Sequence, residues 1–400
     1  MALLAQCGYG RGDRIEAGLG AEAISGVILS PRDETRPRLE TFSHQLRDDF
    51  PDAEILFDPQ FYAATLRAPR DGRLPEYPYY QANSRLSRNQ FGPRQAQRYA
   101  QQVLDYQCDQ LGQLSYLISP SVSFESFDDS WSQIALGMAE AAIEYRETLS
   151  EPPPLLCSIV VSETGLRNSQ LLGEYLDTLS TLETHGFYIL IARDPNANRM
   201  AMDARSMSNL MFMVHVLSLN DYHVKVGYSD WLGLLATAAG ADSTATGWFQ
   251  TLKQFSMARF LPATGGGRPR KRYASGPMLS SVLISPELED IYRANLIERV
   301  LSGTPHDGIL RDGPAVGEAR WTEQIGCVHH WLTLSGLISS VEAGRTVTQR
   351  MGRLIGLIDT AERLYTRLAA ENVSIEADTG PGHLELWRDA MDDFSRQIQS

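Results

Sequence analysis

One stretch decides the fold: residues 228–248 read YSDWLGLLATAAGADSTATGW. An apolar run ends just before it at Gly227, and a helix-forming stretch rich in leucine and alanine begins near Asp230, a residue that suits a helix N-cap. An Ala-Gly-Ala turn then leads into a short strand that ends at Thr246 and Gly247. The sequence therefore predicts a strand, a helix and a second strand, the unit from which parallel α/β sheets are built.

The same unit recurs on both sides of this stretch. Each repeat has a short run, most of them apolar, that stops at a polar or glycine-containing tip, and most runs are separated by enough residues for a helix. Eight such runs predict an α/β fold, a (β/α)8 barrel of the TIM type, in which functional groups lie where strands end and the next loops begin. The runs are Gly26–Ser30, Glu54–Asp58, Tyr116–Ser119, Ser158–Ser162, Phe187–Ala192, His223–Gly227, Asp242–Thr246 and Arg272–Gly276.

This pattern divides the chain into three segments. Residues 1–23 are glycine-rich and are expected to form a loosely ordered lead-in. The barrel takes residues 24–284. Residues 285–400 carry no strand pattern and are expected to form a helical C-terminal region that packs on the barrel. A chain of 400 residues suits one barrel with an appendage.

Composition limits the class of protein. The net charge of −13 excludes non-specific binding of nucleic acid by the whole surface. The sequence has no uncharged apolar stretch long enough to span a membrane and no basic leader, and its four cysteines are scattered. We therefore expect an acidic cytoplasmic protein with reduced thiols and no membrane contact.

Two basic clusters stand out against this acidic background. The first accompanies a tyrosine-rich insertion at residues 60–90, and arginine forks with tyrosine faces suit a phosphorylated or nucleotide-like substrate or a nucleic acid. A solvated surface loop has the same composition. The second cluster, Arg268–Arg272, suits either an anion site or a basic linker. The arginines of the first cluster are Arg67, Arg70, Arg73, Arg85, Arg88, Arg94 and Arg98.

Carboxylates at the strand tips are the candidate catalytic residues. Glu163 and Asp230 each follow an unambiguous strand, and Asp58 is a third candidate. Two carboxylates that face one pocket can divide acid, base and nucleophile roles, because burial and mutual repulsion separate their pKa values, and glycosidic bonds are broken by such pairs. The alternative for each residue is a helix cap or a partner for arginine.

Other tip residues are candidates for substrate binding. Gln60 has the amide to hydrogen-bond a planar base while Tyr62 stacks on it, although a proline-fixed turn anchored by aromatic rings explains the same residues. Thr246 and Gly247 suit a phosphate held by backbone N–H groups, or a tight turn. The full set is Gln60, Tyr62, Arg193, Tyr228, Thr246 and Gly247.

Motifs for metals and cofactors are missing from the sequence. His329 and His330 are adjacent on a predicted helix, where neighbours point to different faces, and no cysteine or histidine group has zinc spacing. Dinucleotide, P-loop and nucleophile-elbow motifs do not occur. We predict no cofactor and no metal.

The segment FDPQ at residues 57–60 and the glycine-bearing tip Thr246-Gly247 resemble features of the queuine tRNA-ribosyltransferase-like barrels, also described as tRNA-guanine transglycosylase-like. That family includes relatives that insert modified bases into DNA. The resemblance covers residues 24–280 and implies base exchange or N-glycosidic cleavage, in which one carboxylate attacks C1′ and another holds the base. It gives Asp230 the position of the nucleophile. The zinc site of that family, three cysteines and a histidine near the C-terminus, has no counterpart in this chain.

Two hypotheses of function follow. The first is an enzyme, transglycosylase-like, that acts on a nucleotide-like or phosphate-bearing substrate through strand-tip carboxylates. The second is a non-catalytic barrel that serves as a subunit of a multi-protein assembly, with the C-terminal helices presenting an apolar stripe to a protein partner or a second copy. A glycoside hydrolase ranks lower, because the seventh predicted strand ends in Thr-Gly-Trp and not in a carboxylate.

Overall fold

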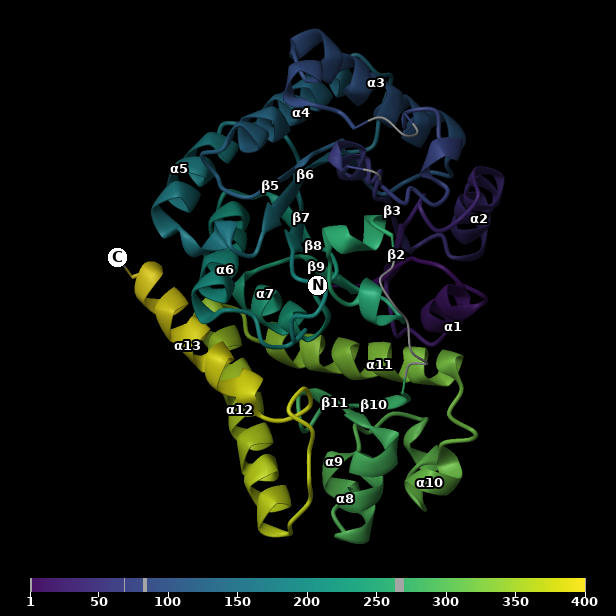
Figure 1. Ribbon diagram of the computed structural model, residues 1–400, viewed down its shortest axis with the longest axis vertical. Helices are drawn as coiled ribbons and strands as arrows, with labels where there is room; N and C mark the ends of the chain where they lie inside the picture. The colour runs from purple at the N-terminus through teal and green to yellow at the C-terminus, as the bar shows by residue number, and fades with distance from the viewer. Residues whose placement is uncertain (1, 68, 82–84, 263–269, 400) are drawn as a thin grey trace.

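A computed structural model describes residues 2–67, 69–81, 85–262 and 270–399. At its centre lies a nearly closed barrel of eight parallel strands in the order β3-β2-β1-β9-β8-β7-β6-β4, which confirms the predicted TIM-like fold (Figure 1). A short further strand, β5, also pairs with β6. The strands are β1 (Ala2–Gln6), β2 (Gly26–Leu29), β3 (Glu54–Phe57), β4 (Leu117–Ile118), β5 (Ser123–Phe124), β6 (Leu155–Ser162), β7 (Gly186–Ala192), β8 (His223–Val226) and β9 (Ser243–Thr246).

The barrel closes between its first and last strands in the sheet order, β3 and β4. No ladder joins these two strands among the described residues, but Ser115 bridges them. The Ser115 backbone N–H donates to the Ile55 carbonyl at 2.9 Å, and its hydroxyl oxygen accepts from the Ile55 N–H at 3.0 Å. The strands therefore meet at one point, and the barrel is closed enough to enclose a core.

The N-terminal segment differs from its prediction as a loosely ordered lead-in. Residues 2–6 form β1, which pairs in parallel with both β2 and β9 in the middle of the sheet order. A strand covered on both faces shows a short continuous apolar run without alternation, and Ala2–Ala5 is such a run. The prediction left this run in the lead-in, although four residues suffice for a strand whose neighbours fix its position.

The eighth predicted strand is also corrected. Arg272–Ser275 forms β10, which pairs antiparallel with β11 (Ser280–Leu283) in a separate two-stranded sheet. The turn between them spans only residues 276–279, too short to return to a parallel strand. The eight barrel strands therefore lie between residues 2 and 246, one unit earlier than the sequence pattern suggested.

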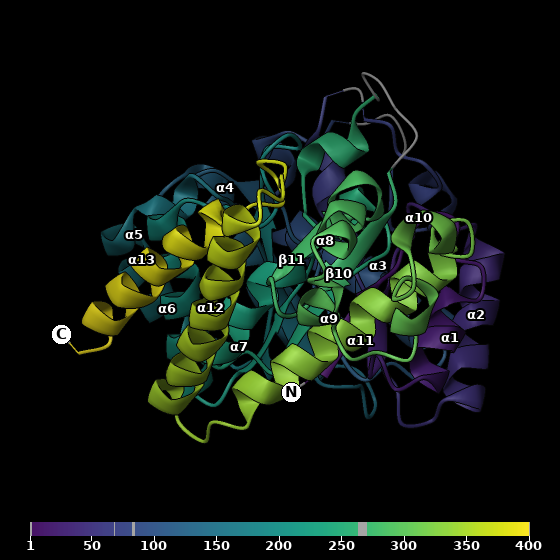
Figure 2. The ribbon, with the colours of Figure 1, turned by 90° about the horizontal axis from the view of Figure 1, so that it is seen from below.

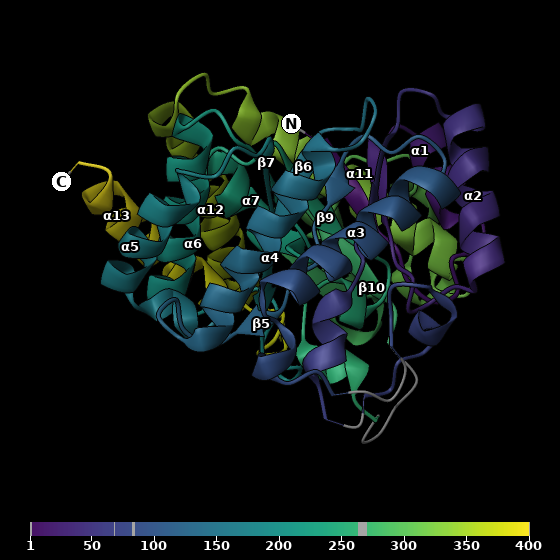
Figure 3. The same ribbon diagram turned by 90° about the horizontal axis from the view of Figure 1, so that it is seen from above.

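Helices surround the barrel in an arc from α1 through α3 and α4 to α6, as Figures 1 and 3 show. Side-chain caps fix the start of α4, α5 and α6. At α4, the Asp129 carboxylate accepts from the Trp131 and Ser132 N–H groups, both at 2.7 Å. The helices are α1 (Arg14–Gly20), α2 (Arg36–Asp49), α3 (Pro93–Gln110), α4 (Ser130–Glu147), α5 (Ser169–Leu179), α6 (Ala204–Leu219) and α7 (Gly233–Ala239).

The ring of helices is completed from the C-terminal region. Helix α11 (Glu323–Glu342) packs against α1, α7 and β1, the place of the eighth helix of a barrel. Its Trp331 indole N–H donates to the carbonyl of Thr246 at the end of β9, at 3.1 Å. The remaining helices of this region are α8 (Glu289–Arg293), α9 (Ile297–Val300), α10 (Pro314–Gly317), α12 (Val347–Ala370) and α13 (Gly382–Gln397).

The last two helices lie along one side of the barrel, seen from below in Figure 2. Helix α12 packs on α7 and helix α13 on α6, so that apolar side chains such as Leu354, Ile358 and Trp387 are buried within the chain. These helices therefore use their apolar faces against the barrel. A protein partner or a second copy at this region stays a prediction.

Candidate functional site

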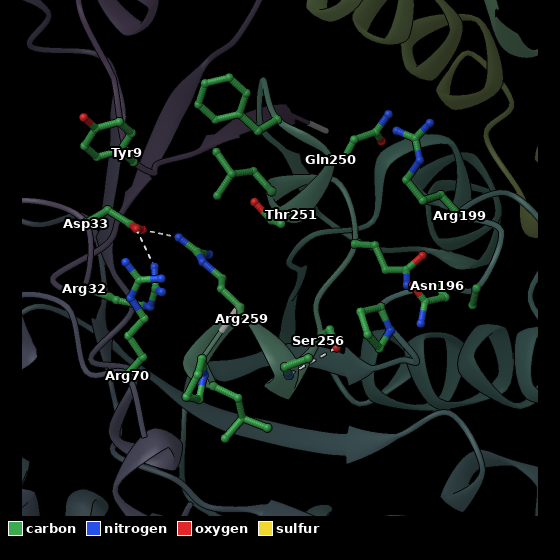
Figure 4. A pocket seen from close by; sticks show the side chains of 18 of the residues that line it. Tyr9, Arg32, Asp33, Arg70, Asn196, Arg199, Gln250, Thr251, Ser256 and Arg259 are labelled. Carbon is green, nitrogen blue, oxygen red and sulfur yellow. Dashed lines mark hydrogen bonds and ion pairs between the residues drawn. The ribbon is translucent and has the colours of Figure 1, made fainter. Parts of the chain in front are cut away.

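Two cavities lie at the carboxyl ends of the barrel strands. The larger has a volume of about 810 Å³, and its wall comes from the loops after β1, β2, β3, β7 and β9 (Figure 4). All these loops leave the same end of a parallel barrel, the end at which TIM-type proteins hold their ligands. The larger cavity is therefore the candidate site.

Positive charge dominates the wall of this cavity. Four guanidinium groups face two carboxylates, in a chain whose net charge is −13. Such a wall binds anions, and guanidinium groups match phosphate and carboxylate through paired hydrogen bonds. The charged lining residues are Arg32, Arg70, Arg199, Arg259, Asp33 and Asp378.

One carboxylate, that of Asp33, holds two of these guanidinium groups. Arg32 Nη1 donates to Asp33 Oδ1 at 2.9 Å, and Arg259 Nη2 forms an ion pair with Asp33 Oδ2. Figure 4 shows the two arginines converging on Asp33, with Arg199 across the cavity. Burial lowers the pKa of Arg32, and the nearby Arg259 adds to this effect. Two cations on one anion leave a net positive charge on this wall.

Tyr228, a predicted substrate-binding residue, supports Arg259 from the buried side of the wall. Arg259 Nη1 donates to the Tyr228 hydroxyl at 2.7 Å. Burial alone lowers the pKa of Arg259, but Tyr228 and Asp33 outweigh burial and raise it above its ordinary value. Tyr228 itself has a φ of +50° at the tip of β8 and is buried. Its hydroxyl therefore fixes an arginine that faces the cavity.

Three predicted site residues at the tip of β3, Asp58, Gln60 and Tyr62, are fully buried behind this wall. Asp58 Oδ2 accepts from the Tyr62 hydroxyl at 2.9 Å, and Asp58 Oδ1 accepts from the Gln60 N–H at 3.0 Å. Burial raises the pKa of Asp58 to about 6, against hydrogen bonds and Arg259, which lower it. The Gln60 amide donates to Ser30 Oγ at 2.9 Å and accepts from the Arg32 N–H at 3.2 Å. These polar groups connect the tips of β2 and β3.

Glu163 and Arg193 form an ion pair at 2.8 Å that shapes another wall of the cavity. Arg193 also donates to the carbonyls of Asn198 and Arg199, at 3.1 and 3.0 Å. The indole N–H of Trp387 on α13 fastens the same loop through the Met200 carbonyl at 2.8 Å. The loop therefore presents Arg199 to the cavity from a fixed backbone.

Asp230 lies at the tip of β8 among hydrogen-bond donors and cations. His330 Nε2 lies 2.7 Å from Asp230 Oδ1, the Thr246 hydroxyl donates to the same oxygen at 3.1 Å, and Arg199 Nη1 lies 3.9 Å from Oδ2. Burial raises the pKa of Asp230, but Lys253, His330 and Arg199 outweigh it and hold the pKa well below its ordinary value. Burial lowers the pKa of His330 to about 4, so the imidazole is neutral at pH 7. Asp230 is thus an ionised partner for the cations around it.

The smaller cavity, of about 140 Å³, adjoins this group. Its wall includes His330, Lys253 and Gly247, the last being a predicted substrate-binding residue. A Cβ at Gly247 would lie 2.6 Å from the Gln6 carbonyl oxygen, which explains the glycine by close packing. The Gly247 N–H donates to the Leu252 carbonyl at 3.0 Å and so closes the turn.

The tyrosines of the insertion at residues 60–90 pack inward. Tyr77, Tyr79 and Tyr80 are buried, and the Tyr77 and Tyr79 rings surround Phe57 together with Tyr106. Their hydroxyls donate to Glu34, Pro59 and Asp71. The stacking faces that the sequence suggested are therefore part of the core, and of this insertion it is Arg70 that reaches the cavity.

The structure describes all nine predicted site residues, and Gly247 alone among them lines either of these two cavities. The others lie deeper, and four of them contact residues that line a cavity: Gln60, Arg193, Tyr228 and Asp230. Sequence reasoning missed Arg199, Lys253 and Arg259, because they lie on loops without periodicity. Arg70 belongs to the first basic cluster, so composition did signal it. The part of the second cluster at residues 268 and 269 lies outside the described residues.

Metal sites and membrane spans were searched within the described ranges. No group of three or more histidine, cysteine, aspartate or glutamate side chains there is placed to hold a metal ion. None of the helices in those ranges has the length and apolar character needed to cross a bilayer.

Fold and site together define a TIM-barrel-like α/β protein with an arginine-rich cavity at the carboxyl ends of its strands. No model of a known protein family matches the chain, and no curated protein matches it either.

Proposed function

We propose that the chain is an enzyme whose larger cavity binds a small phosphate-bearing, nucleotide-like substrate. The excess of guanidinium groups on the cavity wall carries this proposal, because it suits an anion in a chain that is otherwise acidic. Two aromatic residues on the same wall, Tyr9 and Phe249, offer faces for a base, and Tyr9 is 76% exposed.

The reaction that fits these groups is cleavage or exchange of an N-glycosidic bond. Asp33 is the carboxylate on the wall beside the converging arginines, and in this proposal it faces the sugar C1′. Asp58, with a pKa raised by burial to about 6, lies behind the wall and does not reach the substrate, and in this proposal its charge near neutral pH acts on Arg259. The resemblance of residues 57–60 to transglycosylase-like barrels supports the same reaction class. Glu163 and Asp230 then act by positioning Arg193 and Arg199.

Binding is tested first, with Arg70→Gln. Arg70 is exposed and lines the cavity, so the change removes a charge without uncovering core. We expect nucleoside monophosphates to bind the wild type in calorimetry, and the variant to bind at least about tenfold more weakly, the loss of one charge-assisted contact. Arg38→Gln, an exposed arginine on α2 away from the cavity, is the matched control. Equal binding by all three proteins would contradict the proposal.

Turnover is tested with Asp33→Asn. Release of free base from nucleoside phosphates is followed by chromatography, and the fold of the variant is checked by its circular dichroism and melting temperature. We expect the folded variant to bind nucleotide and to release no base. Wild-type release by a folded Asp33→Asn protein refutes the role of Asp33, and the absence of release from every nucleotide by the wild type refutes the reaction class.

A further inference from the structure

The smaller cavity is built from cations that come together from distant parts of the chain. Its wall combines the loop after β9, the start of β10 and the first half of α11. Glu323 is the only carboxylate among the described residues of that wall. The cationic lining residues are Arg14, Arg199, Lys253, Lys271 and Arg272.

The arginines of this wall have anionic partners. Arg14 pairs with Glu323 at 2.7 Å, and Arg272 pairs with Asp378 at 2.8 Å. Arg199 lies 3.9 Å from Asp230. Each of these guanidinium groups is therefore balanced by one carboxylate of the chain.

The two lysines of the wall have no carboxylate in direct contact. Within the described ranges, no carboxylate oxygen lies within 4.0 Å of the ammonium group of Lys253 or Lys271. Lys271 Nζ donates to the backbone carbonyl of Glu318 at 2.5 Å, a neutral partner. Burial, together with Arg199 and Arg272, lowers the pKa of Lys253 to about 8, although Asp230 opposes this effect. The five cations of the wall thus face three carboxylates, those of Glu323, Asp378 and Asp230, which leaves an excess of two positive charges at one small cavity.

Lysine is rare in this chain, so the position of two lysines at one cavity is informative. The sequence holds three lysines, and the third, Lys225, pairs with Glu54 at 2.8 Å. The other basic residues are arginines. Both lysines without a carboxylate partner therefore lie at the same cavity, where a compact ammonium group suits a compact anion.

We propose that the smaller cavity is a second anion site, which binds a phosphate group as its dianion between Lys253, Lys271 and Arg199. A dianion supplies the two negative charges that balance the excess of cations on this wall. The volume of about 140 Å³ is below the ~300 Å³ at which sites for drug-sized ligands begin, so it suits a single phosphate group. The site rests on its own lining residues and stands whether or not the larger cavity is catalytic.

The phosphate has two possible sources, which share this chemistry. Arg199, Phe249 and Gln250 line both cavities, so one ligand with a phosphate end can reach from the larger cavity into the smaller. Free inorganic phosphate is the other source. The experiment separates them by comparing the two ligands.

The probe is pyridoxal 5′-phosphate, whose aldehyde condenses with a lysine amine to an imine that borohydride reduces to a stable amine. Peptide mass spectrometry then locates the label. We expect Lys253 or Lys271 to be labelled and inorganic phosphate to protect them at least about tenfold, as expected for a site with several charge-assisted contacts. Lys225 serves as the internal control and is expected to be unaffected by phosphate.

Calorimetry with inorganic phosphate gives an independent measurement. Lys253→Met is expected to weaken phosphate binding at least about tenfold, and Lys253→Arg to retain most of it. Arg38→Gln, an exposed arginine that lines neither cavity, is expected to leave phosphate binding unchanged. Undiminished binding in Lys253→Met, or labelling that phosphate does not prevent at either lysine, would falsify the site. If Lys253→Met does not fold, the wild-type labelling still decides.

Nucleoside monophosphate distinguishes the two sources. One outcome is that nucleotide protects Lys253 at a lower concentration than inorganic phosphate does, and that Arg70→Gln removes this advantage. That outcome indicates one ligand that spans both cavities. Equal protection by both ligands indicates a site for free phosphate. If no nucleotide binds but phosphate protects Lys253, the proposed function fails and the second anion site stands.

Discussion

Replacing Asp58 by asparagine tests the electrostatics of the buried layer behind the cavity. Asp58 is fully buried, and both of its oxygens accept hydrogen bonds, from Gln60 and Tyr62. No cation of the described residues lies within 4.0 Å of it. The carboxylate therefore has neutral partners, and asparagine has nearly the same shape without the charge.

The magnitude follows from the pKa. Burial raises the pKa of Asp58 from its ordinary value of 3.8 to about 6, so the folded state binds its proton more tightly than the unfolded state. Below pH 3.8 both states are protonated and the carboxyl has no effect on stability. The folded state loses stability as the pH rises between these values, and above pH 6 the loss is constant at about 3 kcal/mol. Asparagine avoids this cost but places one amide N–H opposite Tyr62, so we expect a net gain of about 2 kcal/mol at pH 8.

The assay is urea unfolding of both proteins, followed by tryptophan fluorescence at pH 8 and pH 4.5. The stability difference, variant minus wild type, is expected to be about 2 kcal/mol more favourable at pH 8 than at pH 4.5, because most of the pKa effect is gone at the lower pH. A difference that does not depend on pH, or a loss of stability at pH 8, refutes the assignment of Asp58 as a buried carboxyl with a raised pKa.

Three further predictions concern the support of the two cavities. Asp230→Asn removes the anion that Lys253, His330 and Arg199 face. Unlike Asp58→Asn, it is therefore expected to destabilise the fold at pH 7, by roughly 3 kcal/mol in urea unfolding. A gain in stability would contradict an ionised Asp230. Gly247→Ala places a Cβ 2.4 Å from Leu252 Cβ and 2.6 Å from the Gln6 carbonyl oxygen, and is expected to lower the free energy of unfolding by roughly 1–3 kcal/mol. Gly137→Ala, with open space around its Cβ, serves as the control. Arg193→Met releases the loop that carries Arg199, so a protease is expected to cut within residues 194–203 faster than in the wild type. An unchanged rate of cleavage in this loop would rule out the anchoring role of Arg193.

The fold could be predicted from the sequence to the extent that strands are buried and helices follow them. Runs such as Ser158–Ser162 and Phe187–Ala192 are long, apolar and covered on both faces, and the structure confirms them as parts of β6 and β7. The errors fell on short runs. Ala2–Ala5 and Arg272–Ser275 are both only four residues long, and their long-range pairing assigns the first to the barrel and the second to a hairpin.

The candidate site could be predicted only to its buried layer. Strand tips are readable because the strand pattern fixes where they end, and the predicted residues Asp58, Glu163 and Asp230 do lie there. Arg199, Lys253 and Arg259, which line the cavities, sit on the long segments beyond the tips, where no periodicity constrains them. Arg259 follows β9 by 13 residues, yet it meets Asp33 after β2, a contact that only the closed barrel creates.

The relation between the two layers explains why strand-tip carboxylates and cavity arginines occur together. Arg259 lies over Tyr228 and near Asp58, and Arg199 lies near Asp230, so each of these two arginines has an acidic or phenolic group on its buried side. A guanidinium group held from behind keeps its outer N–H groups for a ligand, and it needs no further ordering when the ligand binds. Asp58 and Asp230 differ in this respect, because cations hold Asp230 ionised while burial raises the pKa of Asp58 to about 6. The buried layer therefore supplies a fixed negative charge under one arginine and a group that titrates near neutral pH close to the other.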